Sequence, residues 1–208
     1  MFRCNPVETE YALRVVDEKV VAVAVPSGRT KVAVIGASGY AGEELVRLLL
    51  AHPHVDLVAV TSRQFAGKTL AEVFPRFSHH EKAKALKFAE SDPTKLARMA
   101  EIIFLALPHG LAAEFAKPLL QAAVRVIDLS ADFRIKDAAV YKEFYGKDHP
   151  APGLLDEAVY GLPEVYRDKI RDAKLVACPG CYPTSIFLPV VPLMRALHGY
   201  LGLDGQRG

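Results

Sequence analysis

The hydrophobic positions of the chain alternate between strand-like and helix-like patterns from residue 31 onward. Residues 31–35 form a continuous apolar run after the lysine, which is typical of a strand buried on both faces of a parallel sheet. Residues 43–51 place leucines at helical spacing and predict a helix, and residues 55–61 predict the next strand. The same patterns predict strands at 101–107, 124–129 and 174–177, and helices at 94–99, 111–122 and 183–197.

This order of elements favours an α/β fold with a doubly wound, mostly parallel sheet, because helices then connect parallel strands through right-handed crossovers. After residue 129 the periodicity fades, and Gly, Pro and Tyr become frequent up to residue 172. We expect long loops there, lying over the carboxyl edge of the sheet, where ligands of α/β proteins bind.

The two ends of the chain lie outside this pattern. Residues 1–30 are predicted to be a separate extension, in which a turn at 17–19 joins residues 13–16 to a strand at 20–25. The sequence assigns this extension no role. Residues 31–177 are predicted to form the main domain. Residues 178–208 are expected to begin an α+β domain that is incomplete, because the chain stops soon after a helix with nothing to pack against.

The bulk composition narrows the function classes. The chain has 208 residues, of which 51% are hydrophobic and 24% are charged, as in ordinary globular proteins. A formal net charge of +2 without a basic block argues against a nucleic-acid partner. The chain lacks both the apolar stretch of roughly 18 residues that spans a membrane and the long apolar segment of a secretory signal. The three cysteines lack the spacing of a disulfide framework, which favours a location in the reducing cytoplasm.

A glycine-rich turn joins the first strand of the main domain to its first helix. It reads Gly36-Ala-Ser-Gly-Tyr-Ala-Gly42, with glycines spaced G-x-x-G-x-x-G rather than G-x-G-x-x-G. A tight turn of this kind lets backbone N–H groups approach a pyrophosphate at a helix N-terminus, as in Rossmann-like domains. The predicted nucleotide-binding residues of this turn are Gly36, Ser38, Gly39, Tyr40, Ala41 and Gly42.

Two further strand ends complete the predicted cofactor site. Ser62 and Arg63 follow the second strand, at about the position where an NAD-specific site carries an acidic residue. An arginine beside a hydroxyl suits the 2′-phosphate of NADP through charge-assisted hydrogen bonds, so NADP is predicted over NAD. Pro108 follows another strand and is expected to border the nicotinamide. For the adjacent His109 a structural role is favoured over that of a catalytic base.

Cys178 and Cys181 precede the predicted helix at 183–197 and allow several interpretations. A zinc site needs a second pair of ligands, and only Cys4 remains, so zinc is disfavoured and no metal is predicted. A redox-active C-x-x-C pair has the right spacing, but such redox domains do not follow a full nucleotide fold with its own glycine turn. Two buried structural cysteines remain an alternative. The favoured interpretation makes Cys181 a single nucleophile, because the positive end of a helix stabilises a thiolate.

A polar segment, Asp128-Leu-Ser-Ala-Asp-Phe-Arg134, closes the strand predicted at 124–129. Its arginine has the planar donor fork that binds a phosphate or a carboxylate. Arg134 is therefore a predicted substrate-binding residue. A purely structural ion pair between Asp132 and Arg134 is the alternative.

Together these motifs resemble the N-acetyl-γ-glutamyl-phosphate reductase family of arginine biosynthesis over about residues 31–200. The residues that carry the resemblance are Gly36-Ala-Ser-Gly-Tyr-Ala-Gly42, Thr61-Ser-Arg63, Leu107-Pro-His-Gly110, Asp128-Leu-Ser-Ala-Asp-Phe-Arg134, Val159-Tyr-Gly-Leu-Pro-Glu164 and Pro179-Gly-Cys-Tyr-Pro-Thr184. The last two of these motifs are far more specific than the glycine turn.

The resemblance implies an NADP-dependent oxidoreductase that uses Cys181 as its nucleophile. The thiolate attacks an acyl phosphate and expels phosphate, and reduction of the resulting thioester by hydride from NADPH yields N-acetylglutamate 5-semialdehyde. The family's general acid is a histidine well beyond the cysteine, and the surroundings of His198 do not match its motif. Since the family continues for roughly another hundred residues or more, which build its subunit interface, we expect a truncated chain with little activity alone and a homo-oligomer at full length.

Several alternatives remain open. A sister reductase acting on aspartyl phosphate or on carrier-linked aminoadipyl phosphate uses the same chemistry, although the motif Pro179-Gly-Cys-Tyr-Pro-Thr184 argues against the aspartyl branch. A non-catalytic nucleotide-sensing module and a thiol–disulfide protein rank lower. In the family, position 178 is often Asn, so Cys178 is a departure that either substitutes simply or allows a reversible disulfide with Cys181.

Overall fold

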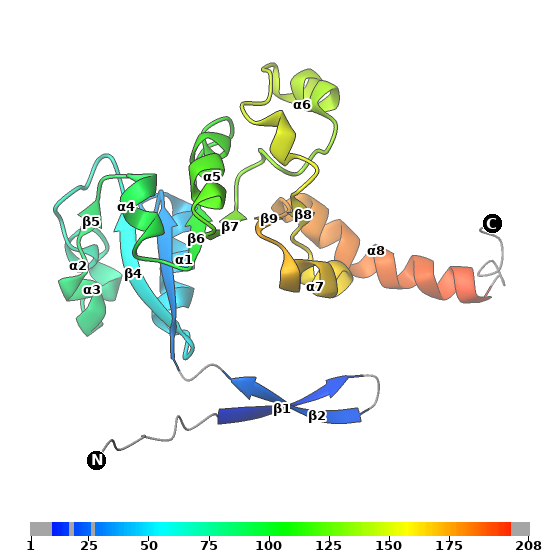
Figure 1. Cartoon of the computed structure of the whole chain (residues 1–208), viewed down its shortest axis with the longest axis horizontal. Helices are drawn as coiled ribbons and strands as arrows, with labels where there is room; N and C mark the ends of the chain where they lie inside the picture. Colours follow the sequence, from blue (N-terminus) through cyan, green and yellow to red (C-terminus); the bar gives the residue numbers. More distant parts are fainter. Residues whose placement is uncertain (1–9, 17–18, 26–27, 201–208) are drawn as a thin grey trace, which may run out of the picture.

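The computed structural model describes the backbone of residues 10–16, 19–25 and 28–200 and the side chains of residues 28–197. Its centre is a seven-stranded sheet in which every paired strand is parallel (Figure 1). The strand order is β5-β4-β3-β6-β7-β9-β8. The strands are β3 (Thr30–Ile35), β4 (Val55–Thr61), β5 (Phe88–Ala89), β6 (Ile102–Leu105), β7 (Arg125–Asp128), β8 (Val159–Tyr160) and β9 (Leu175–Ala177).

The strand order confirms the predicted doubly wound sheet. From the central strand β3 the chain builds β4 and β5 on one side, and it then crosses to build β6, β7, β9 and β8 on the other. The connections contain the helices α1 (Tyr40–Leu50), α2 (Leu70–Val73), α3 (Glu81–Ala85), α4 (Pro93–Ala97), α5 (Ala112–Gln121), α6 (Ala138–Tyr145) and α7 (Pro163–Asp172), and the 3-10 turns η1 (Pro75–Phe77) and η2 (Pro152–Leu154). The helix α8 (Cys181–Tyr200) follows β9.

The central strand is buried on both faces, as its apolar run predicts. Val32 and Val34 pack into one core with residues of α1, and Ala33 and Ile35 pack into a second core with residues of α5. Successive side chains of a strand point to opposite faces, so a strand covered on both sides must be apolar at every position. The two cores hold the sheet between two helical layers.

The prediction of long loops between residues 129 and 172 is wrong. That region contains α6, η2, β8 and α7. The helical periodicity is weak because these helices bury little: α6 buries only Tyr141, and α7 buries no residue. Their local signals are nevertheless present, since Asp137 caps α6 with its side chain, Gly146 ends it in the left-handed conformation, and Pro163 opens α7.

Other predicted elements are confirmed with shifted ends. The helix α1 begins three residues earlier than the periodicity indicates, and α8 begins at Cys181 rather than at residue 183. The sequence analysis missed the short elements α2, α3, η1 and β5, which lie between β4 and α4. They pack Leu70, Phe77 and Phe88 against the α1 side of the sheet.

The N-terminal segment contains an antiparallel pair, β1 (Glu10–Val16) and β2 (Lys19–Val25). This confirms the predicted strand at 20–25, although most of the predicted turn at 17–19 lies outside the described residues. The pair forms its own sheet, separate from the seven-stranded one (Figure 1).

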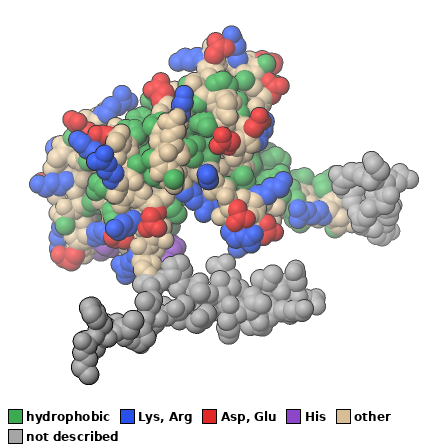
Figure 2. Space-filling view, viewed as in Figure 1, with side chains coloured by type: hydrophobic (Ala, Val, Ile, Leu, Met, Phe, Trp, Pro, Cys, Tyr) green, Lys and Arg blue, Asp and Glu red, His purple; other side chains and the backbone are tan. Residues whose placement is uncertain are grey.

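The helix α8 is apolar and largely exposed. Ile186 and Leu193, for example, are 55% and 58% exposed, and hydrophobic side chains lie on the surface beside the charged ones of α7 (Figure 2). None of the helices in the described part of the chain is long and apolar enough to cross a membrane.

Candidate active site

The predicted functional residues lie along one edge of the sheet. Because the strands are parallel, the turns that follow β4, β3, β6, β7 and β9 all leave the sheet at its carboxyl edge (Figure 1). These turns carry, in that spatial order, Arg63, the glycine turn, Pro108, the 128–134 loop and the cysteines. With roughly 4.8 Å between neighbouring strands, β3 and β9 are roughly 14 Å apart.

Two glycines of the turn are required by packing. Gly36 has a φ of +81°, which side chains rarely tolerate, and a Cβ there would clash with the Ala106 carbonyl oxygen. A Cβ on Gly42 would lie 2.5 Å from the Gly36 carbonyl oxygen and 2.7 Å from the Cα of Ala37. The turn can therefore bring α1 this close to β3 only with glycine at both positions.

The N-terminus of α1 is open. Its capping residue, Gly39, has no side chain, and apart from its chain neighbours the described residues place one atom within 4 Å of a Cβ built there, the Gly36 carbonyl oxygen at 3.8 Å. The first helical hydrogen bond runs from the Glu43 N–H to the Gly39 carbonyl. The N–H groups of residues 40–42 consequently have no acceptor within the helix, and they stand at the positive end of its dipole. This is the environment that binds a phosphate.

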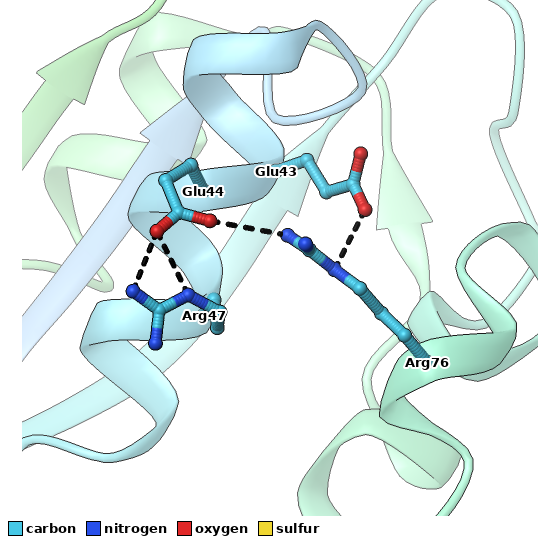
Figure 3. Close-up of polar contacts among 4 residues, drawn as sticks. All are labelled: Glu43, Glu44, Arg47 and Arg76. Carbon is cyan, nitrogen blue, oxygen red and sulfur yellow. Dashed lines mark hydrogen bonds and ion pairs between the residues drawn. The ribbon is translucent and has the colours of Figure 1, made fainter.

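Two acidic residues near the start of α1, Glu43 in its first turn and Glu44 after it, are paired with arginines (Figure 3). Arg76 lies 2.7 Å from a Glu43 carboxylate oxygen and also contacts Glu44, while Arg47 pairs with Glu44. The hydrogen bond from Arg47, followed by the charges of Arg47 and Arg76, holds the pKa of Glu44 below its ordinary value. The pairing offsets negative charge beside the open helix end.

A cavity of about 410 Å³ lies beside this turn. Six predicted cofactor residues line it: Gly36, Ser38, Gly39, Ser62, Arg63 and Pro108. The remaining lining residues, which the sequence analysis missed, are Gln64, Ser91, Ala106, Leu107, Leu111, Glu114 and Phe115. Three predicted cofactor residues do not line the cavity: Tyr40, which is 96% exposed, Ala41 and the buried Gly42.

Ser62 also connects the end of β4 to the glycine turn. It is 4% exposed, and its hydroxyl lies 2.8 Å from the Ser38 hydroxyl, so the end of β4 is tied to the glycine turn. Arg63 is exposed at the cavity. The open helix end suits the phosphates of a nicotinamide dinucleotide, and Arg63, Leu107 and Pro108 line the same cavity.

The two cysteines have different environments. Cys181 is exposed and is the first residue of α8, whose first turn is closed by bonds from the Thr184 N–H and hydroxyl to the Gly180 carbonyl. Cys178 is partly buried, and burial, followed by the nearby charge of Asp128, raises its thiol pKa to about 11. At neutral pH Cys178 stays a protonated thiol, and Cys181 is the accessible one.

The 128–134 loop does not contain the ion pair that was the alternative for Arg134. Among the described residues no salt bridge joins Asp132 to Arg134. Arg134 donates from Nε to the Cys178 carbonyl at 2.8 Å and from Nη2 to the Leu129 carbonyl at 2.9 Å. The arginine thus reaches the turn that precedes Cys181.

Residues 31–173 match the family model described as "Semialdehyde dehydrogenase, NAD binding domain". The chain belongs to the semialdehyde dehydrogenase family. The family's description and the cavity beside the glycine turn agree on a nicotinamide dinucleotide as the class of ligand.

Curated relatives of this semialdehyde dehydrogenase domain carry a common name. The chain is 57% identical over 169 residues to the N-acetyl-gamma-glutamyl-phosphate reductase of Akkermansia muciniphila, covering 81% of this chain and 48% of the relative. The reductase of Nitrosococcus oceani is 47% identical (79% and 47% covered), and that of Pseudomonas aeruginosa is 49% identical (80% and 47% covered). The chain thus spans about half the length of these relatives.

Solved structures of semialdehyde dehydrogenases share the fold. Aspartate semialdehyde dehydrogenase II of Vibrio cholerae, complexed with ASA, superposes with a TM-score of 0.55 at 19% identity, covering 81% of this chain and 47% of that one. The Candida albicans aspartate semialdehyde dehydrogenase with NADP gives 0.58 at 17% identity, covering 80% and 47%. At these identities the likeness extends to the fold.

Asp128 gives this semialdehyde dehydrogenase domain a pH-dependent stability. Burial raises the pKa of Asp128 from 3.8 to about 6, against the opposing hydrogen bonds from Ser130. Between these pH values the folded chain binds more protons than the unfolded chain, so stability falls as the pH rises from 4 to 7. The rise corresponds to roughly 3 kcal/mol.

We therefore expect the unfolding free energy of the wild type, relative to Asp128→Asn, to fall by roughly 2–3 kcal/mol between pH 4 and pH 7. Urea unfolding at four pH values measures it. Asp156→Asn, the same change at an exposed site, is the matched control. A difference that stays constant with pH contradicts a protonated Asp128.

Proposed function

We propose that the chain is the cofactor-binding and nucleophile-bearing part of an N-acetyl-γ-glutamyl-phosphate reductase. The observation that carries the proposal is one sheet edge with a cavity of about 410 Å³ after β3 and an exposed cysteine at the start of α8. The relatives with that name, which are 47–57% identical, support the substrate.

Cys181 is the proposed nucleophile. Its sulfur forms a bond to the acyl carbon of the acyl phosphate, and the carbon–oxygen bond to phosphate breaks, which leaves a thioester on Cys181 and free phosphate. The start of α8 favours the thiolate. The nicotinamide cofactor, when bound, supplies the hydride that reduces the acyl group to the aldehyde. Release of the aldehyde breaks the carbon–sulfur bond and returns the Cys181 thiolate.

Arg134 is the proposed contact for an anionic group of the substrate. Of its five N–H groups, one on Nε and one on Nη2 are engaged by backbone carbonyls within the described residues. The guanidinium therefore retains donors for a phosphate or a carboxylate while it is held beside the thiol-bearing turn.

The proposed cofactor is NADP rather than NAD. Arg63 is exposed at the cavity on the β4 side, where the adenine ribose of a dinucleotide lies in such sheets. We expect Arg63→Ala to weaken NADP binding about tenfold or more and to leave NAD binding within about twofold, because only NADP has a 2′-phosphate. Titration of the chain with both nucleotides measures this effect.

The control for that titration is Arg167→Ala, which removes an exposed arginine on α7, away from the cavity. It should bind both nucleotides like the wild type. Equal losses for NADP and NAD in Arg63→Ala would contradict recognition of the 2′-phosphate and leave Arg63 as a general contact.

The reaction is tested with the protein expressed from its complete reading frame. We expect phosphate-dependent reduction of NADP with N-acetylglutamate 5-semialdehyde and little or none with aspartate semialdehyde. Activity on an aminoadipate semialdehyde analogue alone would favour the sister reductase. NADP binding without activity on any of these substrates would favour the nucleotide-sensing module.

A further inference from the structure

The 128–134 loop lies between the two halves of the proposed active site. It follows β7, and β7 pairs with β6 on one side and with β9 on the other. The turn after β6, residues 106–110, is here called the cofactor turn, and the turn after β9, residues 178–180, is called the thiol turn. The loop makes side-chain hydrogen bonds to both turns.

Asp132 holds the cofactor turn. The side chain of this residue is fully buried, and its carboxylate accepts hydrogen bonds from the Gly110 N–H at 2.6 Å and from the Ala113 N–H at 3.1 Å. These donors belong to the N-terminus of α5, whose own capping residue, Leu111, has no side-chain acceptor. Asp132 therefore caps α5 from the loop that follows β7. It also orients the turn that contributes Leu107 and Pro108 to the cavity.

The same contact gives the N-termini of α5 and α1 different electrostatic environments. The N-terminus of α5 is capped by the Asp132 carboxylate, whereas the acidic residue in the first turn of α1, Glu43, is paired with Arg76, and α1 begins at a glycine without a side-chain cap. A phosphate is repelled from the first and attracted to the second. Asp132 thus favours binding of a dinucleotide's phosphates at α1. The cofactor turn is then available to an uncharged part of the dinucleotide.

Arg134 holds the thiol turn. Its guanidinium bridges the Cys178 carbonyl, on the thiol turn, and the Leu129 carbonyl, in its own loop. A Cβ built on Gly180 would lie 3.3 Å from the Arg134 Nη1, so the planar group packs directly under the residue before Cys181. The two donors leave the guanidinium at fixed angles, so the position of the turn is specified by geometry as well as by charge.

The two contacts are linked by hydrogen bonds within the loop. The Asp132 N–H donates to the Ser130 hydroxyl at 3.1 Å, and that hydroxyl donates to the Asp128 carboxylate at 2.7 Å. The Asp128 carbonyl in turn accepts the Cys178 N–H at 2.8 Å. A buried, fully bonded loop of this kind is stiff. The distance between Asp132 and Arg134 is therefore set by the loop itself.

We propose that the 128–134 loop sets the spacing between the bound nicotinamide and the Cys181 thiol. Asp132 is a positioning residue that acts through the cofactor turn, and Arg134, besides being the proposed substrate contact, positions the thiol turn. The inference rests on the proposed function. Catalysis depends on such spacing, because a displacement of about 1 Å can cost about a hundredfold in rate.

The test compares Asp132→Asn with Arg134→Lys in the 208-residue chain, by NADP titration and by amide hydrogen exchange. Asn offers one carbonyl acceptor where Asp offers two, so Asp132→Asn should weaken NADP binding about fivefold or more and speed exchange at 110–113, but not at 178–184. Lys keeps the charge but has no fork, so Arg134→Lys should speed exchange at 178–184 and leave NADP binding within about twofold.

Kinetics of the protein from the complete reading frame separate the two roles. Asp132→Asn should chiefly raise the KM for NADP, and Arg134→Lys should lower kcat about tenfold or more with little change in that KM. Matched controls are Asp137→Asn, which alters the cap of α6 in the same way, and the exposed Arg167→Lys. Both controls should leave every readout at its wild-type value.

Two results overturn the proposal. In the first, each variant loosens both turns together, as a general loss of stability does. In the second, Arg134→Lys retains wild-type exchange and kinetics, so that charge alone suffices. Failure of the proposed function is distinct: a wild type that binds no NADP contradicts that function, while hydrogen exchange still decides whether Asp132 and Arg134 hold the two turns independently.

Discussion

Replacing Cys181 with serine is expected to lower the reductase activity of the protein from the complete reading frame at least about a thousandfold. A serine hydroxyl becomes a nucleophile only when a base accepts its proton. No histidine or carboxylate hydrogen-bonds to Cys181 among the described residues, and the thiol stands exposed at the start of α8. Initial rates of NADP reduction measure the loss, and NADP titration should give a wild-type Kd.

The neighbouring thiol is the matched control. Cys178→Ser should retain activity within about fivefold, because a buried thiol with a pKa of about 11 is protonated at neutral pH and does not compete as a nucleophile. Equal losses in the two variants would contradict a single nucleophile and would favour a redox-active pair instead.

Gly42→Ala is expected to lower the free energy of unfolding by roughly 3 kcal/mol, or roughly 6–12 °C in Tm. The added methyl group would lie 2.5 Å from the Gly36 carbonyl oxygen and 2.7 Å from the Ala37 Cα, and both neighbours are backbone atoms that cannot rotate away. The helix α1 must move from β3, which also displaces its open N-terminus. NADP binding should therefore weaken together with stability, as thermal unfolding and titration on one sample can measure.

Two other glycines complete that experiment. Gly153→Ala should leave Tm and binding unchanged, since in the described part of the chain no atom beyond its chain neighbours lies within 4 Å of the added carbon. Gly39→Ala also has room, so we expect Tm to be retained while binding weakens, because Gly39 lines the cavity. Wild-type stability in Gly42→Ala would contradict the close packing of α1 on the glycine turn.

Local patterns predicted most of the sheet. The strand at β3 and the glycine turn were predictable because burial on both faces and a tight strand-to-helix turn each leave a signal in neighbouring residues. The helices α6 and α7 were not predicted from periodicity, because a helix that buries few side chains lacks the stripe of apolar residues on which such a prediction depends. Their caps at Asp137 and Pro163 were the usable signal.

The candidate site likewise contains residues that local patterns predicted and residues that only the fold brings together. Six of the predicted cofactor residues line the cavity, since each follows a recognisable strand. Ser91 also lines it, but nothing in the sequence places the end of β5 near the glycine turn, so only the strand order could reveal it. The predicted alternative for Arg134 failed because the nearest carboxylate along the chain, Asp132, accepts hydrogen bonds from backbone N–H groups at the start of α5 instead.

By itself the sequence determined the parallel α/β sheet and the glycine turn at 36–42, because these depend on residues adjacent along the chain. The proposed choice of Cys181 over Cys178 also comes from the sequence, through its motif. The tertiary structure alone decided which turns meet. The order β4-β3-β6-β7-β9 places Arg63, the glycine turn and the cysteines along one edge, and it puts the 128–134 loop between the cofactor turn and the thiol turn. Such contacts join residues far apart in the chain, and only folding sets the distance between them.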